Sequence, residues 1–343
     1  MTDQTFPLIE VSGTSYEMGY QHGRQAGDLI QKYLCFIEKL TGKPRTELCR
    51  NARAFYPLIE KLSPPLIEEI KGLAEGADIS LDEALLCQAR GEAAGVPTEG
   101  CTAFALKGSA TANGTTFAGQ NQDLEPEYAD VAILLRVSPS DGRPRALLFT
   151  FAGQLGYSGM NQFGLAHFAN QLYDAPWKPG LPHYPLKRVI LEQNNLDDCL
   201  KILRENPTCS AANMVFCLGD GQIADVEIRP EGVAQYTDTH PDSILHANHY
   251  LAPEFARHET NTFKDSCSRL DRMRELVREN WGNITLNTLK TILADHQGDP
   301  AAICRHGERD MISISGYIAE PAKGLLHVRR GPGCTGTWTA YEV

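Results

Sequence analysis

The stretch TEGCTAFALKGSATANGTTFAGQNQD, residues 98–123, passes from a polar, glycine-bearing loop into a strand pattern at Gly100-Cys101. Apolar residues recur in TAFALKG directly after the cysteine, and TTFAGQ repeats the strand pattern beyond Asn113-Gly114. An Asn-Gly pair between two such segments is a strong hairpin signal. The stretch therefore predicts a β-hairpin whose first strand starts at a cysteine, where a loop ends.

The glycine before this cysteine points to chemistry at the peptide bond between them. The thiol of Cys101 can attack the carbonyl of Gly100, which converts the peptide bond into a thioester that water then cleaves. Glycine suits position 100 because it has no side chain to block the approach and tolerates a strained backbone. Because a Gly-Cys dipeptide also arises by chance, a role for Cys101 as a small buried hydrophobic residue stays open from these residues alone.

Cleavage would leave Cys101 as a new N-terminus that carries its own base. A free α-amino group has a pKa of about 7.7–8.0 and a cysteine thiol one of about 8.5. The neutral amine can therefore take the thiol proton near neutral pH, and no histidine is needed to activate the nucleophile.

Composition and charge limit the class of protein. The chain has 343 residues, of which 42% are apolar and 22% charged, as in an ordinary globular protein. No apolar run is long enough to span a membrane, and the first residues do not form a secretory signal, so we expect a cytoplasmic protein. The net charge of −11 argues against a nucleic-acid partner, and no glycine-rich phosphate-binding loop is present.

The cysteines and histidines give no local metal-binding pattern. The ten cysteines contain no C-x-x-C pair, so the sequence predicts reduced thiols and neither a zinc site nor a thioredoxin-type site. His246 and His249 lie three positions apart, but a strand does not place such residues on one face, and no cysteine or carboxylate cluster accompanies them. We therefore expect no metal and no cofactor.

The first hundred residues are predicted to be helical. Thr14 and Glu17 form a capping box at the start of the first helix. Gly19, Gly23 and Gly27 follow on one helical stripe, which favours close packing against a neighbouring element over a ligand-facing role.

After Cys101 the pattern changes to strands in antiparallel runs with helices between them. Further strands are predicted near residues 131–137, 146–153, 163–173, 213–219, 223–229, 311–318 and 324–329. Helices are predicted near residues 183–193, 196–205, 267–280 and 286–295. Strands and helices that are segregated in this way predict an α+β layered fold.

Motifs along nearly the whole chain carry a family resemblance. They are GCTA (100–103), GQNQD (119–123), YEMGYQHG (16–23), IKGLAEG (70–76), NQFGL (161–165), HANHYL (246–251) and ICR (303–305). In this order they resemble the isopenicillin N acyltransferase family. Its members are cysteine-type N-terminal nucleophile hydrolases, which activate themselves by cleaving a Gly–Cys bond.

The resemblance implies a fold and a mature form. The fold is an α+β, four-layer αββα sandwich of the N-terminal nucleophile hydrolase type. Self-cleavage would give an N-terminal helical fragment, residues 1–100, and a catalytic fragment, residues 101–343, that starts at the nucleophile. The two fragments would stay together as one domain, an αβ heterodimer.

The resemblance also implies residue roles. Cys101 would be the nucleophile in both self-cleavage and catalysis. Asp123 would hold the free α-amine of Cys101, and Asn248 would donate an N–H to the oxyanion of the tetrahedral intermediate. Arg305 would lie close to the nucleophile and favour its thiolate. Asn170 is the candidate for a second oxyanion donor.

Each of these residues also has a structural explanation when taken singly. Asp123 suits a turn after a strand, Asn248 suits a capping position, and Arg305 suits a surface ion pair. A papain-like arrangement with His167 and Asn170 would also pair a cysteine with a histidine, but the helix-borne cysteine motif of that family is missing.

The chemistry is acyl transfer through a thioester on Cys101, either to water or to an amine. The expected substrate is a small-molecule amide, such as an N-acyl amine or a β-alanyl amine, or an acyl thioester. The fungal prototype of the family transfers acyl groups from coenzyme A thioesters to a penicillin nucleus. That activity is the alternative here, because an acidic chain does not favour anionic substrates, although Arg329-Arg330 forms a local basic pair.

Two further hypotheses belong to other classes. One is an N-terminal nucleophile fold that cleaves itself but binds without turnover. The other is a non-enzymatic, uncleaved α+β protein. The sequence leaves homo-oligomerisation open.

Overall fold

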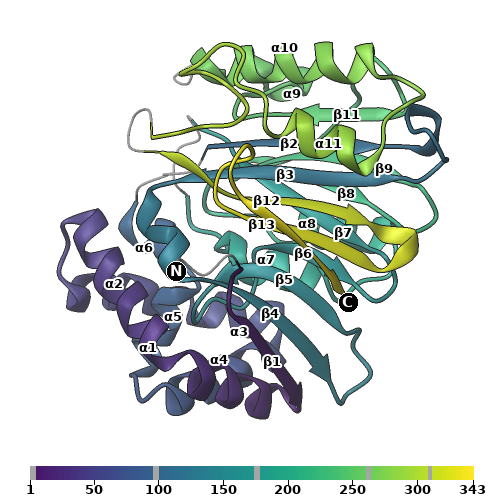
Figure 1. Ribbon diagram of the computed structural model, residues 1–343. Helices are drawn as coiled ribbons and strands as arrows, with labels where there is room; N and C mark the ends of the chain where they lie inside the picture. The colour runs from purple at the N-terminus through teal and green to yellow at the C-terminus, as the bar shows by residue number, and fades with distance from the viewer. Residues whose placement is uncertain (1–4, 96–99, 174–177, 260–263, 308–310) are drawn as a thin grey trace.

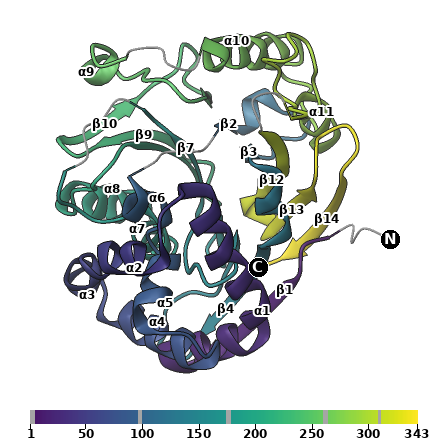
Figure 2. The same ribbon diagram turned by 90° about the vertical axis from the view of Figure 1, so that its left-hand side faces the viewer.

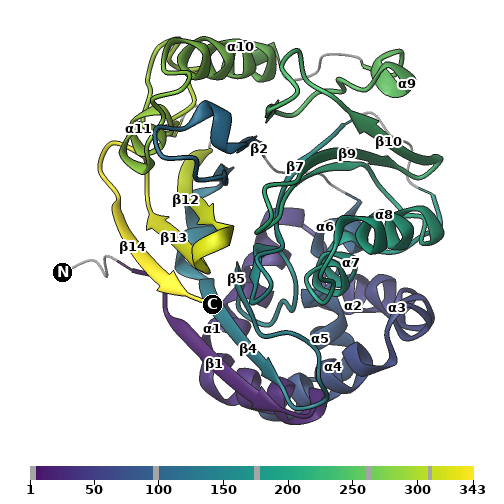
Figure 3. The same ribbon diagram turned by 90° about the vertical axis from the view of Figure 1, so that its right-hand side faces the viewer.

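Two β-sheets face each other, and helices cover both outer sides (Figure 1). The computed structural model describes residues 5–95, 100–173, 178–259, 264–307 and 311–343. Figures 2 and 3 view the molecule from its two sides and show α1 to α8 beyond one sheet and α10 and α11 beyond the other. The order helix, sheet, sheet, helix confirms the predicted four-layer sandwich.

Within the described ranges, the first sheet has eight strands and the second has six. In sheet order the strands of the first are β1 (Leu8–Gly13), β4 (Ala132–Pro139), β5 (Ala146–Phe151), β6 (Ser158–Asn161), β7 (Ala166–Gln171), β8 (Ala212–Cys217), β9 (Ile223–Arg229) and β10 (Gly232–Tyr236). Those of the second are β11 (Ser243–His246), β2 (Gly100–Leu106), β3 (Phe117–Leu124), β12 (Ile312–Glu320), β13 (Leu325–Arg330) and β14 (Thr337–Glu342).

The helices of the described residues fall into two groups. On the side of the first sheet lie α1 (Ser15–Thr41), α2 (Arg45–Arg53), α3 (Tyr56–Leu62), α4 (Pro64–Gly76), α5 (Leu81–Cys87), α6 (Arg90–Ala94), α7 (His183–Ile190) and α8 (Leu196–Glu205). Along the second sheet lie α10 (Lys264–Glu279) and α11 (Leu286–Ile292), with the short α9 (Pro253–Ala256) before them.

Two large apolar clusters separate these layers. The larger fills the space between the sheets and under α1 and α4, and it includes Ala103, Ala105 and Ala118 of the hairpin. The other lies between the second sheet and α10 and α11, and it includes Phe104 and Leu106. Alternate residues of β2 thus enter different cores, as the period of two along a strand requires.

The glycine stripe of α1 is a helix-packing surface. A Cβ on Gly19 would lie 1.9 Å from the carbonyl oxygen of Glu69 in α4, and one on Gly72 of α4 would lie 2.0 Å from the carbonyl oxygen of Tyr16. Such distances are far below van der Waals contact, so only glycine permits this approach. Gly27 meets no neighbour within 4 Å, so the packing stripe ends before it.

Most predicted elements are present, with one clear correction near the N-terminus. The predicted capping box at Thr14 is formed, and the predicted hairpin is formed by β2 and β3 with a ten-residue connection, residues 107–116. The first hundred residues are not all helical, because β1 pairs in parallel with β4. Ile9 and Val11 are buried and Glu10 is exposed, which is a strand alternation that a six-residue segment only weakly signals.

Among the residues that the structure describes, no helix is both long and apolar enough to cross a membrane.

Candidate active site

The register of the hairpin decides where the side chains at the junction point. Gly100 lies opposite Asp123, and Cys101 lies opposite Gln122. Opposed residues share a face of a sheet. Gln120, on the same face as Gln122, donates to a backbone carbonyl of β7 at 3.0 Å, so this face looks into the space between the sheets. Cys101 is therefore on the inner face of the second sheet, and Gly100 and Asp123 are on its outer face, toward α10.

Asn248 and Arg269 hold the backbone of Cys101. The nitrogen of Cys101 donates to Oδ1 of Asn248 at 2.9 Å. Nη1 of Arg269, from α10, donates to the carbonyl oxygen of Cys101 at 2.5 Å and to the hydroxyl of Thr102 at 2.7 Å. All four residues are at least 97% buried. A hydrogen bond to a charged donor contributes about 1.5–3 kcal/mol, so the first strand is firmly fixed at the junction.

The Asn248 side chain spans the two sheets. Its Oδ1 accepts from Cys101 and also from Nη2 of Arg269 at 2.8 Å, and its Nδ2 donates to the carbonyl oxygen of Gln171 at the end of β7 at 2.9 Å. Because two donors face one end of the amide and a carbonyl faces the other, the network fixes which end is oxygen. Asn248 thus lies against the nucleophile candidate, as predicted. Its role as an oxyanion donor stays a prediction.

Asp123 lies directly beneath Gly100. A Cβ at position 100 would be 3.3 Å from Cβ of Asp123, so glycine keeps this approach open. Oδ1 of Asp123 accepts from the hydroxyl of Ser313 at 2.6 Å, and Oδ2 is 3.5 Å from Nε of Arg305. Complete burial raises the pKa of Asp123, and the positive charge of Arg305 opposes that shift. In the continuous chain the backbone nitrogen of Cys101 donates to Asn248, and the predicted hold of Asp123 on the free α-amine of the cleaved form stays a prediction.

Arg305 joins Asp123 to a second buried carboxylate, Asp265 at the start of α10. Its guanidinium forms ion pairs with both, and all three residues are at least 94% buried. The backbone nitrogen of Arg305 donates to the hydroxyl of Ser313, which in turn donates to Asp123. Buried charges of this kind are tolerated only when they are paired, so Arg305 is a buried network member rather than half of a surface ion pair.

Asn170 lies across the space between the sheets from β2. It is on the same face of β7 as Phe168, whose ring stacks on Tyr317 of the second sheet. Its backbone nitrogen donates to Oδ1 of Asn213 at 3.2 Å. Both polar atoms of the Asn170 side chain are buried and have no hydrogen-bond partner among the described residues. An unsatisfied buried amide is costly, and the role of Asn170 as a second oxyanion donor stays a prediction.

A charged histidine braces the segment that carries Asn248. Nε2 of His246 lies 3.1 Å from Glu227 and 4.0 Å from Asp225, and its Nδ1 contacts the carbonyl of residue 247. Burial lowers the pKa of His246, but Asp225 and Glu227 more than offset this and raise it to about 9. Glu227 also accepts from the backbone nitrogens of residues 251 and 252. Both ring nitrogens are thus engaged in holding the chain.

Three other histidines are neutral and bonded within the fold. Burial lowers the pKa of His249 to about 4 and that of His22 and His167 to about 3. His249 contacts the hydroxyl of Ser266 at 2.7 Å, and His22 accepts from the backbone nitrogen of residue 153 at 3.1 Å. These contacts are those of structural side chains.

Sequence reasoning missed Arg269 and Asp265. Arg269 lies in the helix that was predicted from residue 267, and the buried Met273 stands four positions after it, whereas Asp265 stands four positions before Arg269 and two before the predicted start. Residues at this spacing share one face of a helix. The sequence signal for these two residues was their opposite charges on the helix face that also carries the buried Met273.

Comparison with known proteins shows the family of this chain. Residues 109–320, more than half of the chain, match the family described as acyl-coenzyme A:6-aminopenicillanic acid acyl-transferase. The chain belongs to this family. The match begins after Cys101, so the role of the junction rests on its geometry.

Two curated relatives are enzymes that act on acyl groups or amides. The acyl-coenzyme A:6-aminopenicillanic-acid-acyltransferase 40 kDa form of Emericella nidulans is 28% identical over 306 residues, which are 87% of this chain and 84% of the relative. The beta-alanyl-dopamine/carcinine hydrolase of Drosophila melanogaster is 24% identical over 226 residues, 59% of this chain and 58% of the relative. The predicted enzyme class, an acyltransferase or amide hydrolase, is confirmed.

Two solved structures align with large parts of this chain. A Caenorhabditis elegans ortholog of N-acylethanolamine-hydrolyzing acid amidase aligns with a TM-score of 0.47 and 11% identity over 65% of this chain and 93% of that chain. A mutant of the conjugated bile acid hydrolase from Clostridium perfringens aligns with a TM-score of 0.48 and 13% identity over 71% of this chain and 92% of that chain.

Proposed function

We propose that the protein cleaves itself between Gly100 and Cys101 and then acts, through a thioester on Cys101, as an amidohydrolase or acyltransferase on small amides. The observation that carries this proposal is the environment of the junction. Asn248 and Arg269 hold the backbone of Cys101, Asp123 packs under Gly100, and an amide without a partner among the described residues, that of Asn170, faces the same space as Cys101.

Self-cleavage is an N→S acyl shift followed by hydrolysis. Sγ of Cys101 attacks the carbonyl carbon of Gly100, and the bond from that carbon to the nitrogen of Cys101 breaks as the nitrogen takes a proton. Water then hydrolyses the thioester to give the carboxylate of Gly100 and a free thiol. Asn248 accepts from the departing nitrogen already in the continuous chain, so the new amine is held where it forms.

Catalysis repeats the same steps on a substrate. The amine of Cys101 takes the proton of its own thiol, and the thiolate attacks the substrate carbonyl. The amine returns the proton to the leaving group, and the acyl group remains on Sγ until water or an acceptor amine removes it. Asn248 and Asn170 lie on either side of this space and are the proposed donors to the oxyanion.

The proposed substrate is a neutral or cationic small amide. Arg305 is paired with Asp123 and Asp265, and Arg269 is bonded to the junction, so both guanidiniums near Cys101 are engaged. Arg329 and Arg330, the basic pair noticed in the sequence, donate to Asn121 and to backbone carbonyls. None of these contacts leaves a cluster of cations for the phosphates of coenzyme A.

Acyl transfer from a coenzyme A thioester is the second candidate function. It is favoured by the 28% identity to the fungal acyltransferase, which extends over 87% of this chain. A self-cleaving protein that binds without turnover would differ from both candidates by forming no covalent adduct.

The experiment combines intact-mass measurement with a substrate panel. Purified protein should separate under denaturing conditions into two chains, and the larger should begin with Cys-Thr-Ala-Phe. The cleaved protein is then incubated with N-acyl amines, β-alanyl amines and acyl-coenzyme A thioesters. Growth of an acyl adduct on the larger chain identifies the donor, and released acid or a new amide distinguishes hydrolysis from transfer. A chain that stays whole and still hydrolyses amides would overturn the proposal.

A further inference from the structure

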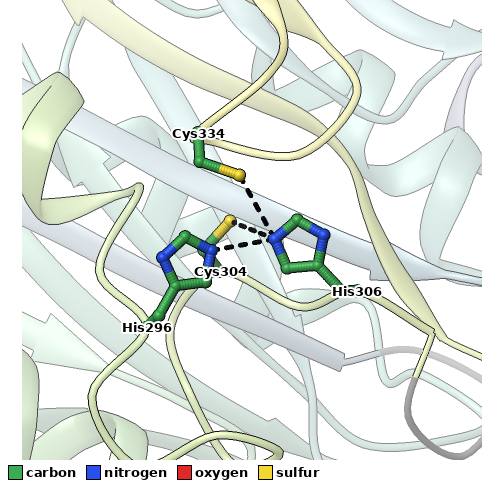
Figure 4. A group of neighbouring side chains, drawn as sticks. All are labelled: His296, Cys304, His306 and Cys334. Carbon is green, nitrogen blue, oxygen red and sulfur yellow. Dashed lines mark hydrogen bonds between the residues drawn. The ribbon is translucent and has the colours of Figure 1, made fainter.

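Two histidines and two cysteines converge beside the loop that carries Arg305 (Figure 4). They are His296, Cys304, His306 and Cys334, here called the His/Cys quartet. One ligand atom from each lies within 4.8 Å of every other. Cys304 is buried, and the other three residues are exposed at the surface.

Hydrogen bonds alone do not account for this arrangement. Nε2 of His306 lies 2.8 Å from Nε2 of His296, 3.2 Å from Sγ of Cys334 and 3.6 Å from Sγ of Cys304. A ring nitrogen carries either one proton or one lone pair, so it can satisfy one of these neighbours and not three. A cation at the centre would satisfy all four ligand atoms at once.

The spacing fits tetrahedral coordination. Zinc binds histidine nitrogen at about 2.0–2.1 Å and cysteine sulfur at about 2.3 Å, which places tetrahedral ligand atoms roughly 3.3–3.8 Å apart. The distance of 3.6 Å lies within this range, that of 3.2 Å lies just below it, and the two histidine nitrogens, 2.8 Å apart, would have to separate slightly around an ion. Two cysteines with two histidines are also a standard ligand set of structural zinc sites.

We propose that the His/Cys quartet binds one zinc ion as a structural site. With four protein ligands the site is closed, so the ion has no open position for a substrate. This inference concerns a site separate from the thioester chemistry, and it differs from the expectation that the chain has no metal site.

The surroundings of the quartet support a bound thiolate. The backbone nitrogen of Gly333 donates to Sγ of Cys304 at 3.2 Å, as amides do to metal-bound sulfur. The backbone nitrogen of Cys304 donates to the carbonyl oxygen of Asp295, whose carboxylate pairs with Arg272 of α10 at 2.9 Å. Cys304 is thus held both at its sulfur and at its backbone nitrogen.

The ion would tie together three segments of the chain. His296 follows α11, Cys304 and His306 precede β12, and Cys334 lies between β13 and β14. Arg305 stands between two of the ligands, and its guanidinium reaches Asp123 and Asp265 near Cys101. A zinc ion here would fix the backbone from which Arg305 enters the active site.

The test uses untagged protein prepared without chelators, and it counts zinc per chain. Wild type should contain about one zinc ion, as a closed four-ligand site requires. Cys334→Ser and His296→Ala should each lower the zinc affinity by more than about a hundredfold, since even changes outside the ligand shell cost 10- to 100-fold. Cys35→Ser, at an exposed cysteine on α1, is the matched control and should retain the ion.

A second measurement keeps the test valid if a variant does not fold. Replacing zinc by Co²⁺ in wild-type protein should give the visible absorption of tetrahedral cobalt with thiolate ligands. Reduced protein that takes up neither ion would overturn the proposal, and so would zinc retained in both ligand variants. A disulfide between Cys304 and Cys334 in freshly purified protein, found by mass mapping, would replace the metal with a covalent link and also overturn it.

Discussion

Two regions of this molecule bring cysteine and histidine together, and they differ in what the histidines touch. Around Cys101, His246 is bonded to carboxylates and His249 to a hydroxyl, and Asn248 and Arg269 hold the cysteine backbone. In the His/Cys quartet the imidazole nitrogens face sulfur and one another. In the first region, hydrogen-bond donors and acceptors surround the backbone of Cys101. In the second, two nitrogens and two sulfurs with lone pairs lie around a common centre.

This difference shows that the atoms around a cysteine, rather than the types of residue nearby, indicate whether it suits the role of a nucleophile or that of a metal ligand. Both Cys101 and Cys304 are buried, and each neighbours a charged or polar network. A thiol that must attack a carbonyl needs its sulfur accessible to that carbonyl and its backbone fixed. A thiolate that binds a cation needs other ligands at tetrahedral spacing, and of these two regions only the quartet supplies them.

The largest expected effect is at Cys101. Cys101→Ala should leave a single chain near 37.8 kDa and lower activity roughly 10⁴-fold or more, because the same sulfur serves cleavage and turnover. Denaturing gels and amide hydrolysis assays measure both. Cys35→Ala should cleave and turn over like wild type. If Cys101→Ala is still cleaved, another residue must carry out the cleavage, and Cys101 would not differ from the quartet cysteines as a nucleophile.

Asn248→Ala should have the next largest effect. It removes the acceptor for the nitrogen of Cys101 and the proposed oxyanion donor, so kcat should fall by about 10²–10³ with little change in KM. Kinetics are measured only on material that has cleaved, because slow maturation would otherwise mimic slow turnover. Asn287→Ala, at an exposed position of α11, is the matched control. Normal turnover in Asn248→Ala would remove Asn248 from the oxyanion site.

Asp123→Asn should move the pH–rate profile as well as the rate. A carboxylate near the α-amine favours its ammonium form, so removing the charge should lower the pKa of that amine. Activity requires the neutral amine, and the acid limb should therefore shift to lower pH, by roughly one unit or more. The profile is measured on cleaved protein, with the cleaved fraction quantified first. A profile that superimposes on that of wild type would leave Asp123 a structural partner of Ser313 and Arg305.

The smallest effect on activity is expected at His246. His246→Gln should keep activity within about tenfold of wild type, or roughly 1.4 kcal/mol in the activation barrier. The reason is that the imidazole holds the backbone in place and does not contact the reacting atoms. A loss of several thousandfold would instead indicate a thiol–imidazole mechanism and place the histidine among the reacting groups.

Stability should respond to His246 in a defined pH window. The pKa of His246 is raised from 6.5 to about 9, so the ion-pair stabilisation is fully present below about pH 6.5 and is lost as pH rises through 9. Asp225, whose pKa is raised from 3.8 to about 7 mainly by burial, acts in the same direction at lower pH, since its contribution is lost as pH rises through 7. Denaturant unfolding of wild type should therefore show a falling free energy of unfolding across this window. His246→Gln should flatten that dependence, and an unchanged slope would contradict the assigned ion pair.

The sequence was informative where chemistry is carried by neighbours along the chain. The strand start at Gly100-Cys101, the hairpin around Asn113-Gly114 and the capping box at Thr14 are local patterns, and each is found where it was predicted, while the loop residues 96–99 lie outside the described residues. The motif of residues 246–251 also led to Asn248, which the fold brings against Cys101 across 147 positions.

What the sequence alone determined is thus the junction, the layered class of fold and the family. Only the tertiary structure decided which atoms meet. In the continuous chain Asn248 accepts from the nitrogen of Cys101, and Arg269 reaches the carbonyl oxygen of Cys101 because α10 covers β2. The four residues of the His/Cys quartet lie between positions 296 and 334, and their spacing in the sequence does not indicate that their side chains meet. Hydrogen bonds and coordination depend on distances of about 2–3 Å, and these are set by the packing of whole layers rather than by adjacent residues.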